Sequence, residues 1–296
     1  MSFKPMLSAA ALSESDIFKN WPKGGVLASP KLDGIRCVLH PELGPVSRNL
    51  KPIPNRYIRE ILGGPARAGV CFDGEIVTAT NGVWDEFSTV SSKVMSRDGE
   101  PDFYLQVFDS FRFPNTEFVD RQLSVAADCF YWERCTPLSH KHCATIRQFL
   151  EYAEECVLEG YEGAMYRDPQ GGYKYGRSTL REGWLVKWKV FQDAEGTVVG
   201  FEEKMHNANE ATVDALGRTE RSSHRAGMVP AGTLGALVLD TSWGQLRVGT
   251  GFTDQQRAAI WAAKSQYVGR VVTFKYQAEG SKDLPRFPVF KAWRED

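Results

Sequence analysis

Lys31 is the residue with which this chain could begin covalent chemistry. It lies in the segment SPKLDGIR at residues 29–36, two positions before an Asp-Gly pair and five before Arg36. A lysine amine becomes nucleophilic when it loses its proton, and burial or neighbouring cations lower its pKa and favour that loss. Arg36 and later lysines could supply the cations, and Asp33 could orient the amine. The plainer alternative is an ordinary β-hairpin, because Asp-Gly between apolar runs is typical of a two-residue turn.

Further charged residues stand inside segments that otherwise predict buried strands, namely Glu75, Glu162, Lys187 and Lys189. A charge in such a setting must be paired, bound to a ligand or turned to solvent. For any one of them, a salt bridge or a solvent-facing position explains the pattern. Together with Lys31 and Arg36, they favour one shared site for a polyanion and a divalent metal.

The composition is that of a soluble globular protein. Of the 296 residues, 42% are hydrophobic and 25% charged, which excludes a disordered or fibrous chain. Formal net charge is −1, so a nucleic-acid partner would have to meet local basic clusters. The six cysteines form no C-x-x-C pair, which indicates reduced, mostly buried thiols. We expect no signal peptide and no membrane span, and a monomer in the cytoplasm of a bacterial or phage-infected cell.

The order of the predicted elements divides the chain near residue 190. A helix and loop are expected up to about Lys23, then short strands over 26–109, helices over 118–131 and 143–158, and strand-like segments over 162–167 and 184–189. Beyond 195 come further short strands and one helix over about 255–264, capped by Thr253 or Asp254. We therefore predict an α+β protein, with antiparallel sheets and flanking helices in a domain 1–190 and a small OB-fold β-barrel in a domain 191–296.

Six short motifs follow one another along the chain: KLDGIR at 31–36, SR at 47–48, FDGE at 72–75, VFD at 107–109, EG at 162–163 and LVKWK at 185–189. In this order they resemble motifs of the covalent nucleotidyltransferases, which comprise ATP-dependent DNA ligases, RNA ligases and mRNA capping enzymes. The segment RFPVFKAWRED at 286–296 resembles the closing motif of DNA ligases. The likeness, with no large domain before it, is to minimal phage-type and bacterial accessory ligases, and it implies an adenylation domain followed by an OB-fold.

The resemblance implies that Lys31 attacks the α-phosphorus of ATP, forms a lysyl-AMP and expels pyrophosphate. It implies that Glu75 bonds the ribose and, with Glu162, helps to hold Mg²⁺ or Mn²⁺. Phe108 would stack on the adenine, although a place in the core is the commoner fate of a strand phenylalanine. The other implied nucleotide contacts are the backbone of Ser29 and Pro30, Arg36 and Arg48 on sugar or nick phosphate, and Lys187 and Lys189 on the α-phosphate.

Basic residues elsewhere are candidate DNA contacts. Those in the strand and loop after the EG motif are Arg167, Lys174 and Arg177, which suit a triphosphate or a DNA backbone, or else a solvated loop. A polar insertion over about 205–232 is either a clasp on the duplex or a surface loop, and its His206 and His224 are interpreted as polar surface. The remaining candidates are Arg48, Lys93, Arg97, Arg218, Arg221, Arg225, Arg286, Lys291 and Arg294.

These observations predict an ATP-dependent DNA ligase that seals 5′-phosphate/3′-hydroxyl nicks in duplex DNA. An RNA ligase or a capping enzyme would use the same chemistry, and the ending at 286–296 favours the DNA ligase. A non-catalytic OB-fold protein that binds nucleic acid is a third alternative, against which the complete set of charged motif residues argues. An NAD-dependent ligase is disfavoured, because the sequence has neither a cysteine-rich finger nor the N-terminal segment of such enzymes.

Overall fold

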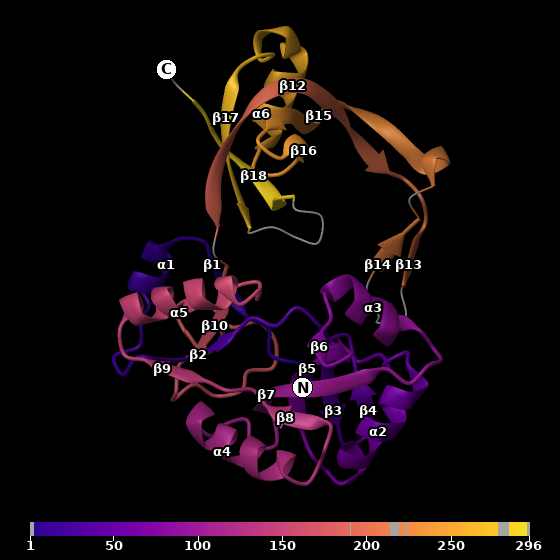
Figure 1. Ribbon diagram of the computed structural model, residues 1–296, viewed down its shortest axis with the longest axis vertical. Coiled ribbons are helices and arrows are strands. Elements are labelled where there is room, and N and C mark those ends of the chain that lie inside the picture. The colour runs from indigo at the N-terminus through magenta and orange to yellow at the C-terminus, as the bar shows by residue number, and fades with distance from the viewer. Residues whose placement is uncertain (1–2, 190, 214–218, 223, 278–283, 295–296) are drawn as a thin grey trace. The chain divides into compact units, whose positions relative to one another are not determined.

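The structure is a computed structural model that describes residues 3–189, 191–213, 219–222, 224–277 and 284–294. The chain divides into two compact units (Figure 1). The first unit comprises Met1–Lys189 with Val213–Arg218, and the second comprises Val190–Thr212 with Thr219–Asp296. No helix of the described residues is both long and apolar enough to cross a membrane.

Two sheets form the body of the first unit. The first sheet has the order β1-β11-β10-β2-β9, with β1 Ala9–Ala11, β11 Val186–Trp188, β10 Ala164–Arg167, β2 Val26–Pro30 and β9 Lys141–Cys143. The second has the order β4-β3-β5-β7-β8, with β4 Gly44–Val46, β3 Ile35–His40, β5 Phe72–Thr80, β7 Asp102–Ser110 and β8 Cys135–Pro137, and β6 Val83–Trp84 also pairs with β5. Their strands are antiparallel except for β1 beside β11 and β8 beside β7.

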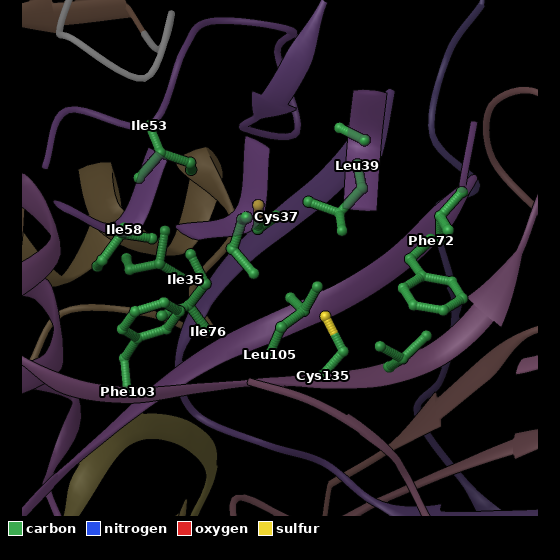
Figure 2. Packing of buried hydrophobic residues seen from close by; sticks show 14 of the residues in the cluster. Ile35, Cys37, Leu39, Ile53, Ile58, Phe72, Ile76, Phe103, Leu105 and Cys135 are labelled. Carbon is green, nitrogen blue, oxygen red and sulfur yellow. The ribbon is translucent and has the colours of Figure 1, made fainter. Parts of the chain in front are cut away.

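One face of the second sheet carries the main hydrophobic core. Along β7, Phe103 and Leu105 are fully buried in it, beside Ile35 and Ile76 from the neighbouring strands (Figure 2). Burying one such side chain stabilises the fold by about 1.5–3 kcal/mol. The helices that cover this face are α2 Arg56–Arg67, α3 Phe87–Met95 and α4 Phe118–Cys129. Because side chains alternate along a strand, the opposite face of this sheet is left for other partners.

Helix α5, Ile146–Leu158, covers the first sheet through contacts with β2, β9 and β10. It begins at Thr145, whose hydroxyl accepts a hydrogen bond from the Gln148 backbone while the Gln148 side chain bonds back, a capping box. The buried Phe149 of this helix packs its ring edge against Tyr166 of β10.

The segment around Lys31 is not a hairpin. Strand β2 pairs with β10 and β9, whereas β3 pairs with β4 and β5, so the chain crosses from one sheet to the other between Pro30 and Ile35. The Asp-Gly pair therefore serves a crossover, and tertiary pairing overrides the local turn signal. Near the N-terminus, the expected helix is only the short α1, Glu14–Phe18, because the preceding alanines form β1 on the edge of β11.

The second unit is built on one sheet with the order β16-β15-β12-β17-β18. Its strands are β12 Gln192–Asn207, β15 Met228–Thr241, β16 Gly244–Val248, β17 Val271–Gln277 and β18 Arg286–Trp293. The two edges meet at one bridge between Thr250 and Val289, so the described strands form a partly open barrel. Helix α6, Asp254–Ala262, begins at the predicted cap Thr253 and packs on β15.

The polar insertion over 205–232 is largely strand in its described part. β12 and β15 continue their pairing to Asn207 and Met228, and the short strands β13 Ala211–Val213 and β14 Thr219–Arg221 pair with one another. A single-turn 3₁₀ helix, η1, follows at Arg225–Gly227, and a second, η2, lies at Lys264–Gln266. All six cysteines are free thiols, five of them buried, as the sequence predicts.

A buried ion-pair group ties the two sheets of the first unit together. Asp109, at the end of β7, has no exposed surface and receives Arg121 of α4 at 2.8 Å and Arg167 of β10 at 2.7 Å. Arg121 also donates from Nη1 to the backbone oxygens of Thr116 and Gly171, so most of its N–H groups are hydrogen-bonded inside the unit. Buried ion-pair groups of this kind contribute little net stability, but removing one partner leaves an uncompensated buried charge.

We therefore expect Asp109→Asn to lower the free energy of unfolding by about 3–5 kcal/mol, measured by urea denaturation. The matched control is Asp102→Asn, since Asp102 pairs with Arg134 at the surface and should cost about 1 kcal/mol or less. Equal losses for the two variants would contradict the structural role given to Asp109.

His140 gives the stability a defined dependence on pH. Burial lowers the pKa of this imidazole to about 4, with Arg167 acting in the same direction, and its ring lies edge-on to Phe118. The unfolded chain binds a proton near pH 6.5, so stability is lost as pH falls from about 6.5 to about 4, by at most about 3 kcal/mol. His140→Gln should remove that loss in urea denaturation at pH 5 against pH 7.5. The control His142→Gln, which alters an exposed histidine, should leave the loss of stability in place. An unaltered pH dependence in His140→Gln would contradict this account.

Candidate active site

A cavity of about 280 Å³ lies within the first unit and takes its walls from both sheets. Its lining residues are Leu7, Ser8, Ser29, Pro30, Lys31, Leu32, Arg36, Arg48, Glu75, Phe108, Leu138, Met165, Arg167, Arg177, Leu185 and Lys187. From the second sheet come residues on the face opposite the helix-covered core. The fold thus leaves one face of each sheet available to a ligand.

Strand register sets the floor of the cavity on the first sheet. Ser29 of β2 lies opposite Met165 of β10, and Met165 lies opposite Lys187 of β11. Residues opposite each other across a sheet place their side chains on the same face. A short polar side chain, a thioether and a cation therefore form one row beneath the cavity.

Lys31 is held by backbone and by charge. Its N–H donates to the Gly163 oxygen at 2.9 Å, and its own carbonyl accepts from the Glu162 N–H at 3.3 Å. The Lys31 ammonium pairs with the Glu162 carboxylate, which also pairs with Lys189. Burial acts to raise the pKa of Glu162, but Lys31 and Lys189 outweigh it, so the pKa lies below its ordinary value. Glu162 is thus a firmly ionised counter-charge for two lysines.

Gly163 makes this docking possible. Its φ of +140° lies in a region that suits glycine, and a Cβ there would stand 2.4 Å from the Trp188 oxygen. The chain at Gly163 passes this close to β11 while its carbonyl receives the Lys31 amide. A side chain at this position would separate Glu162 from the lysines it contacts.

Burial disfavours the charged forms of both Glu75 and Lys187, so their pKa values shift in opposite directions. Burial raises the pKa of Glu75 to about 7, although Lys31 and Arg36 oppose the shift. Burial also lowers the pKa of Lys187, and the neighbouring Lys189 and Lys31 lower it further. Each shift indicates that a bound ligand of opposite charge would stabilise the charged form of that side chain.

The Phe108 ring belongs to the cavity and not to the core. Its neighbours Val107 and Leu105 are buried in the core, whereas Phe108 is only half-buried. The guanidinium carbons of Arg36 and Arg167 lie 5.2 and 5.8 Å from the ring centroid. An aromatic face bordered by cations suits a flat, electron-rich ring that carries phosphate.

The predicted nucleotide contacts are largely brought together. Ser29, Pro30, Lys31, Arg36, Arg48, Glu75, Phe108 and Lys187 line the cavity, and Glu162 and Lys189 join it through the ion pairs with Lys31. Glu75 and Glu162 are the carboxylates available to a divalent metal. The described residues contain no cluster of three or more potential metal ligands, so a metal here would need oxygen atoms from a bound phosphate and water.

The predicted DNA contacts of the first unit are placed very differently from one another. Arg177 lines the cavity, Arg48 lines both the cavity and a smaller adjoining pocket, and Arg97 is exposed. Arg167 also lines the cavity, and its side chain is 3% exposed and paired with Asp109 inside the unit. Two lysines already have carboxylate partners, Lys93 with Asp85 and Lys174 with Glu182.

In the second unit, the closing-motif cations Lys291 and Arg294 pair with Asp193 and Glu195 of β12, and Arg286 lies over the Phe287 ring. Arg221 and Arg225 are exposed in the insertion, where Arg221 donates to the Asn209 oxygen. Arg218 and the last two residues of the closing motif lie outside the described residues.

Sequence reasoning missed part of the cavity lining: Leu7, Ser8, Leu138 and Met165 lie outside the motifs, and Leu32 and Leu185 lie within motifs but were given no role. Alternation on the strand after the EG motif, with Ala164 and Tyr166 buried, could have indicated Met165. No signal marks residues 7 and 8, because their position depends on a parallel bridge from Leu7 to Arg177.

Comparison with protein families decides between the functional alternatives. Residues 5–189 match the family model described as ATP dependent DNA ligase domain, and residues 227–294 match DNA ligase OB-like domain. The chain belongs to the ATP-dependent DNA ligase family. It is therefore a DNA ligase that uses ATP, as the sequence predicts, and the RNA-ligase, capping and non-catalytic alternatives find no support. The ligase matches none of the curated proteins.

Solved structures of DNA ligases resemble this ligase along nearly its whole length. The Chlorella virus DNA ligase-adenylate is 29% identical with a TM-score of 0.55, over 99% of this chain and 100% of that one. A Lig E DNA ligase is 22% identical with a TM-score of 0.71, over 99% and 100%. The bacteriophage T7 ATP-dependent DNA ligase in complex with ATP is 16% identical with a TM-score of 0.50, over 98% of each chain. The last two establish a shared fold.

Gly163→Ala should lower the free energy of unfolding of this ligase by about 2–4 kcal/mol, from backbone strain and the collision with the Trp188 oxygen. The control is Gly160→Ala, whose φ of +90° is also left-handed but whose added Cβ meets nothing within 4 Å. That variant should lose only about 1–2 kcal/mol of strain energy. Equal losses in chemical denaturation would show that the close approach at Gly163 is unimportant.

Proposed function

We propose that this ligase seals 5′-phosphate/3′-hydroxyl nicks in duplex DNA through an adenylate on Lys31 and then an adenylate on the DNA end. The observation that carries the proposal is the position of the Lys31 amine. It lies in a cavity whose other polar walls are mostly cations, Arg36, Arg48, Arg177 and Lys187 among them. Such a lining suits a triphosphate and the nick phosphate in turn.

The first step requires a neutral amine. Lys31 is held by Glu162 while it is charged, and loss of its proton to solvent removes the attraction that fixes it there. The freed Nζ lone pair then attacks the α-phosphorus, so an N–P bond forms as the P–O bond to pyrophosphate breaks. Lys187 and Lys189 would stabilise the negative charge that spreads over the phosphate oxygens.

The remaining walls orient the nucleotide. Phe108 offers an aromatic face for the adenine, and the backbone at Ser29 and Pro30 would read its edge. Glu75, a carboxyl whose pKa burial raises to about 7, would hydrogen-bond a ribose hydroxyl. Arg36 and Arg48 would contact the sugar or the 5′-phosphate of the nick. The 3′-hydroxyl then displaces AMP from the DNA end and closes the strand.

Glu75 and Glu162 would hold Mg²⁺ or Mn²⁺. The donor set fits, since hard carboxylate oxygens near a phosphate site are what these ions take, and Mg²⁺ is commonly bound by one or two carboxylates with substrate phosphates. When bound, the ion supplies positive charge at the phosphate oxygens.

The two family matches support the proposed division into an adenylation domain, 1–190, and an OB-fold domain, 191–296. In the second domain Arg286, Lys291 and Arg294, and in the first Lys93, Arg97, Lys174 and Arg177, are proposed as backbone contacts to nicked DNA. Lys93, Lys174, Lys291 and Arg294 would have to exchange an internal carboxylate for a phosphate. We further propose that the ligase acts as a cytoplasmic monomer.

Lys31→Ala and Lys31→Arg should both abolish the covalent adduct formed with labelled ATP and Mg²⁺, because neither side chain offers a neutral amine. Wild-type adduct should disappear when nicked DNA is added, and the label should pass to the 5′ end. Exposed Lys23→Ala is the control and should label normally. Labelling of Lys31→Arg would overturn the assignment of the nucleophile.

The insertion is proposed as a clasp on the duplex. Replacing Arg218, Arg221 and Arg225 with Ala should flatten the dependence of nick binding on salt, by up to about 0.9 in the log–log slope for each phosphate that the variant no longer neutralises. Arg147→Ala, which alters an 89% exposed arginine of α5, should leave the slope unchanged. A wild-type slope in the triple variant would rule the clasp out.

A further inference from the structure

Arg36 is fixed by a closed ring of hydrogen bonds that runs through the N-terminal segment. Its Nε and Nη2 donate to the two oxygens of Asp73 at 2.8 and 2.5 Å, and Nη2 also donates to the Met6 oxygen at 2.6 Å. The Tyr173 hydroxyl donates to Asp73 at 2.6 Å and accepts from the Met6 N–H at 3.1 Å. Each of the four residues in the ring is therefore hydrogen-bonded to two of the others.

The ring is sealed from solvent apart from the end that faces the cavity. Asp73 and Met6 have no exposed surface, Tyr173 is 4% exposed, and the Arg36 side chain is 16% exposed. Burial, with Asp73 acting in the same direction, raises the pKa of Tyr173 well above its ordinary value, so the phenol remains a donor. The bidentate bond to Asp73 orients the guanidinium, and the Met6 oxygen adds a third acceptor on Nη2, which ties that orientation to the N-terminal segment.

A second cavity arginine is held by the same segment. Arg177 donates from Nη1 to the Ser8 oxygen at 2.7 Å, two residues beyond the oxygen that receives Arg36. The intervening Leu7 is bonded on both sides, from its N–H to Gly176 at 2.7 Å and from Ser178 to its oxygen at 2.8 Å. Residues 6–8 thus present alternate carbonyls to two arginines while their neighbours secure the backbone.

We propose that Tyr173 and the backbone of residues 6–8 are positioning elements of this ligase, which hold Arg36 and Arg177 in the orientation that meets the nucleotide and the nick phosphate. Tyr173 touches no reacting atom and acts through Asp73 on Arg36. The inference deepens the proposed function and rests on it for the kinetic part of its test.

Tyr173→Phe removes one hydroxyl and keeps the buried ring. Its rate constant for adduct formation from labelled ATP, in a single turnover at saturating ATP, should fall about tenfold, the change expected when one hydrogen bond to a charged group is removed. Tyr175→Phe is the matched control, because Tyr175 lies in the same loop, is 42% exposed and contacts the Tyr173 ring edge-on. It should retain the wild-type rate, and circular dichroism should show all variants folded.

The decisive comparison uses Arg36→Lys as a second background. If Tyr173 acts through Arg36, Tyr173→Phe changes the rate less than about twofold when Arg36 is already replaced, as a double-mutant cycle requires of a coupled pair. An equal loss in both backgrounds would mean that Tyr173 acts independently, and it would overturn the proposal. A wild-type rate for Tyr173→Phe would overturn it as well.

A readout independent of activity separates failure of this inference from failure of the proposed function. In ¹⁵N-resolved NMR of the full chain, the Arg36 Nε–H signal, assigned by its loss in Arg36→Lys, should exchange with solvent at least about tenfold faster in Tyr173→Phe than in Tyr175→Phe. Equal exchange rates would overturn the ring even if the ligase forms its adduct. If Tyr173→Phe speeds the exchange of the Arg36 Nε–H in a protein that forms no adduct, the hydrogen-bonded ring is supported and the proposed chemistry is rejected.

Discussion

Three buried or half-buried acids, Asp73, Asp109 and Glu162, hold the cationic side chains of the first unit in place. A cavity that is to receive phosphates must concentrate positive charge, and like charges brought together repel one another in a medium of low dielectric constant. Each acid removes part of that repulsion and fixes an orientation at the same time. The distances and burial of this small set of ion pairs decide what the cavity can bind.

The same acids join elements that are distant in sequence. Asp109 connects β7 of the second sheet to Arg167 on β10 of the first, and Glu162 connects the crossover at Lys31 to the lysine that follows β11. The two sheets face each other across the cavity because these links and the N-terminal segment hold them there. Stability and chemistry are therefore coupled, since a side chain that orients a catalytic group also closes the fold.

Much of the site could be predicted because short motifs place particular residue types at fixed spacing. Lys31, Glu75, Glu162, Lys187 and the strand phenylalanine Phe108 were named from sequence, and the structure places them at or beside one cavity. Their catalytic roles remain proposals. Two interpretations of local sequence depended on partners that local sequence does not reveal. Asp-Gly was compatible with a hairpin until β2 and β3 were found in different sheets, and Arg167 was compatible with a surface loop until Asp109 was found beside it.

By itself, the sequence determined the α+β composition and most helices and strands, and its motifs carried the resemblance to DNA ligases from which Lys31 is proposed as the nucleophile. These follow from periodicity, capping residues and motif spacing, which are local properties of a chain. Only the tertiary structure decided that Leu7 and Ser8 line the cavity, that Tyr173 donates to the carboxylate that pairs with Arg36, and that Glu162 faces two lysines. Such contacts join residues as distant as Ser8 and Arg177, 169 positions apart, and a hydrogen bond between them exists only when packing brings donor and acceptor together.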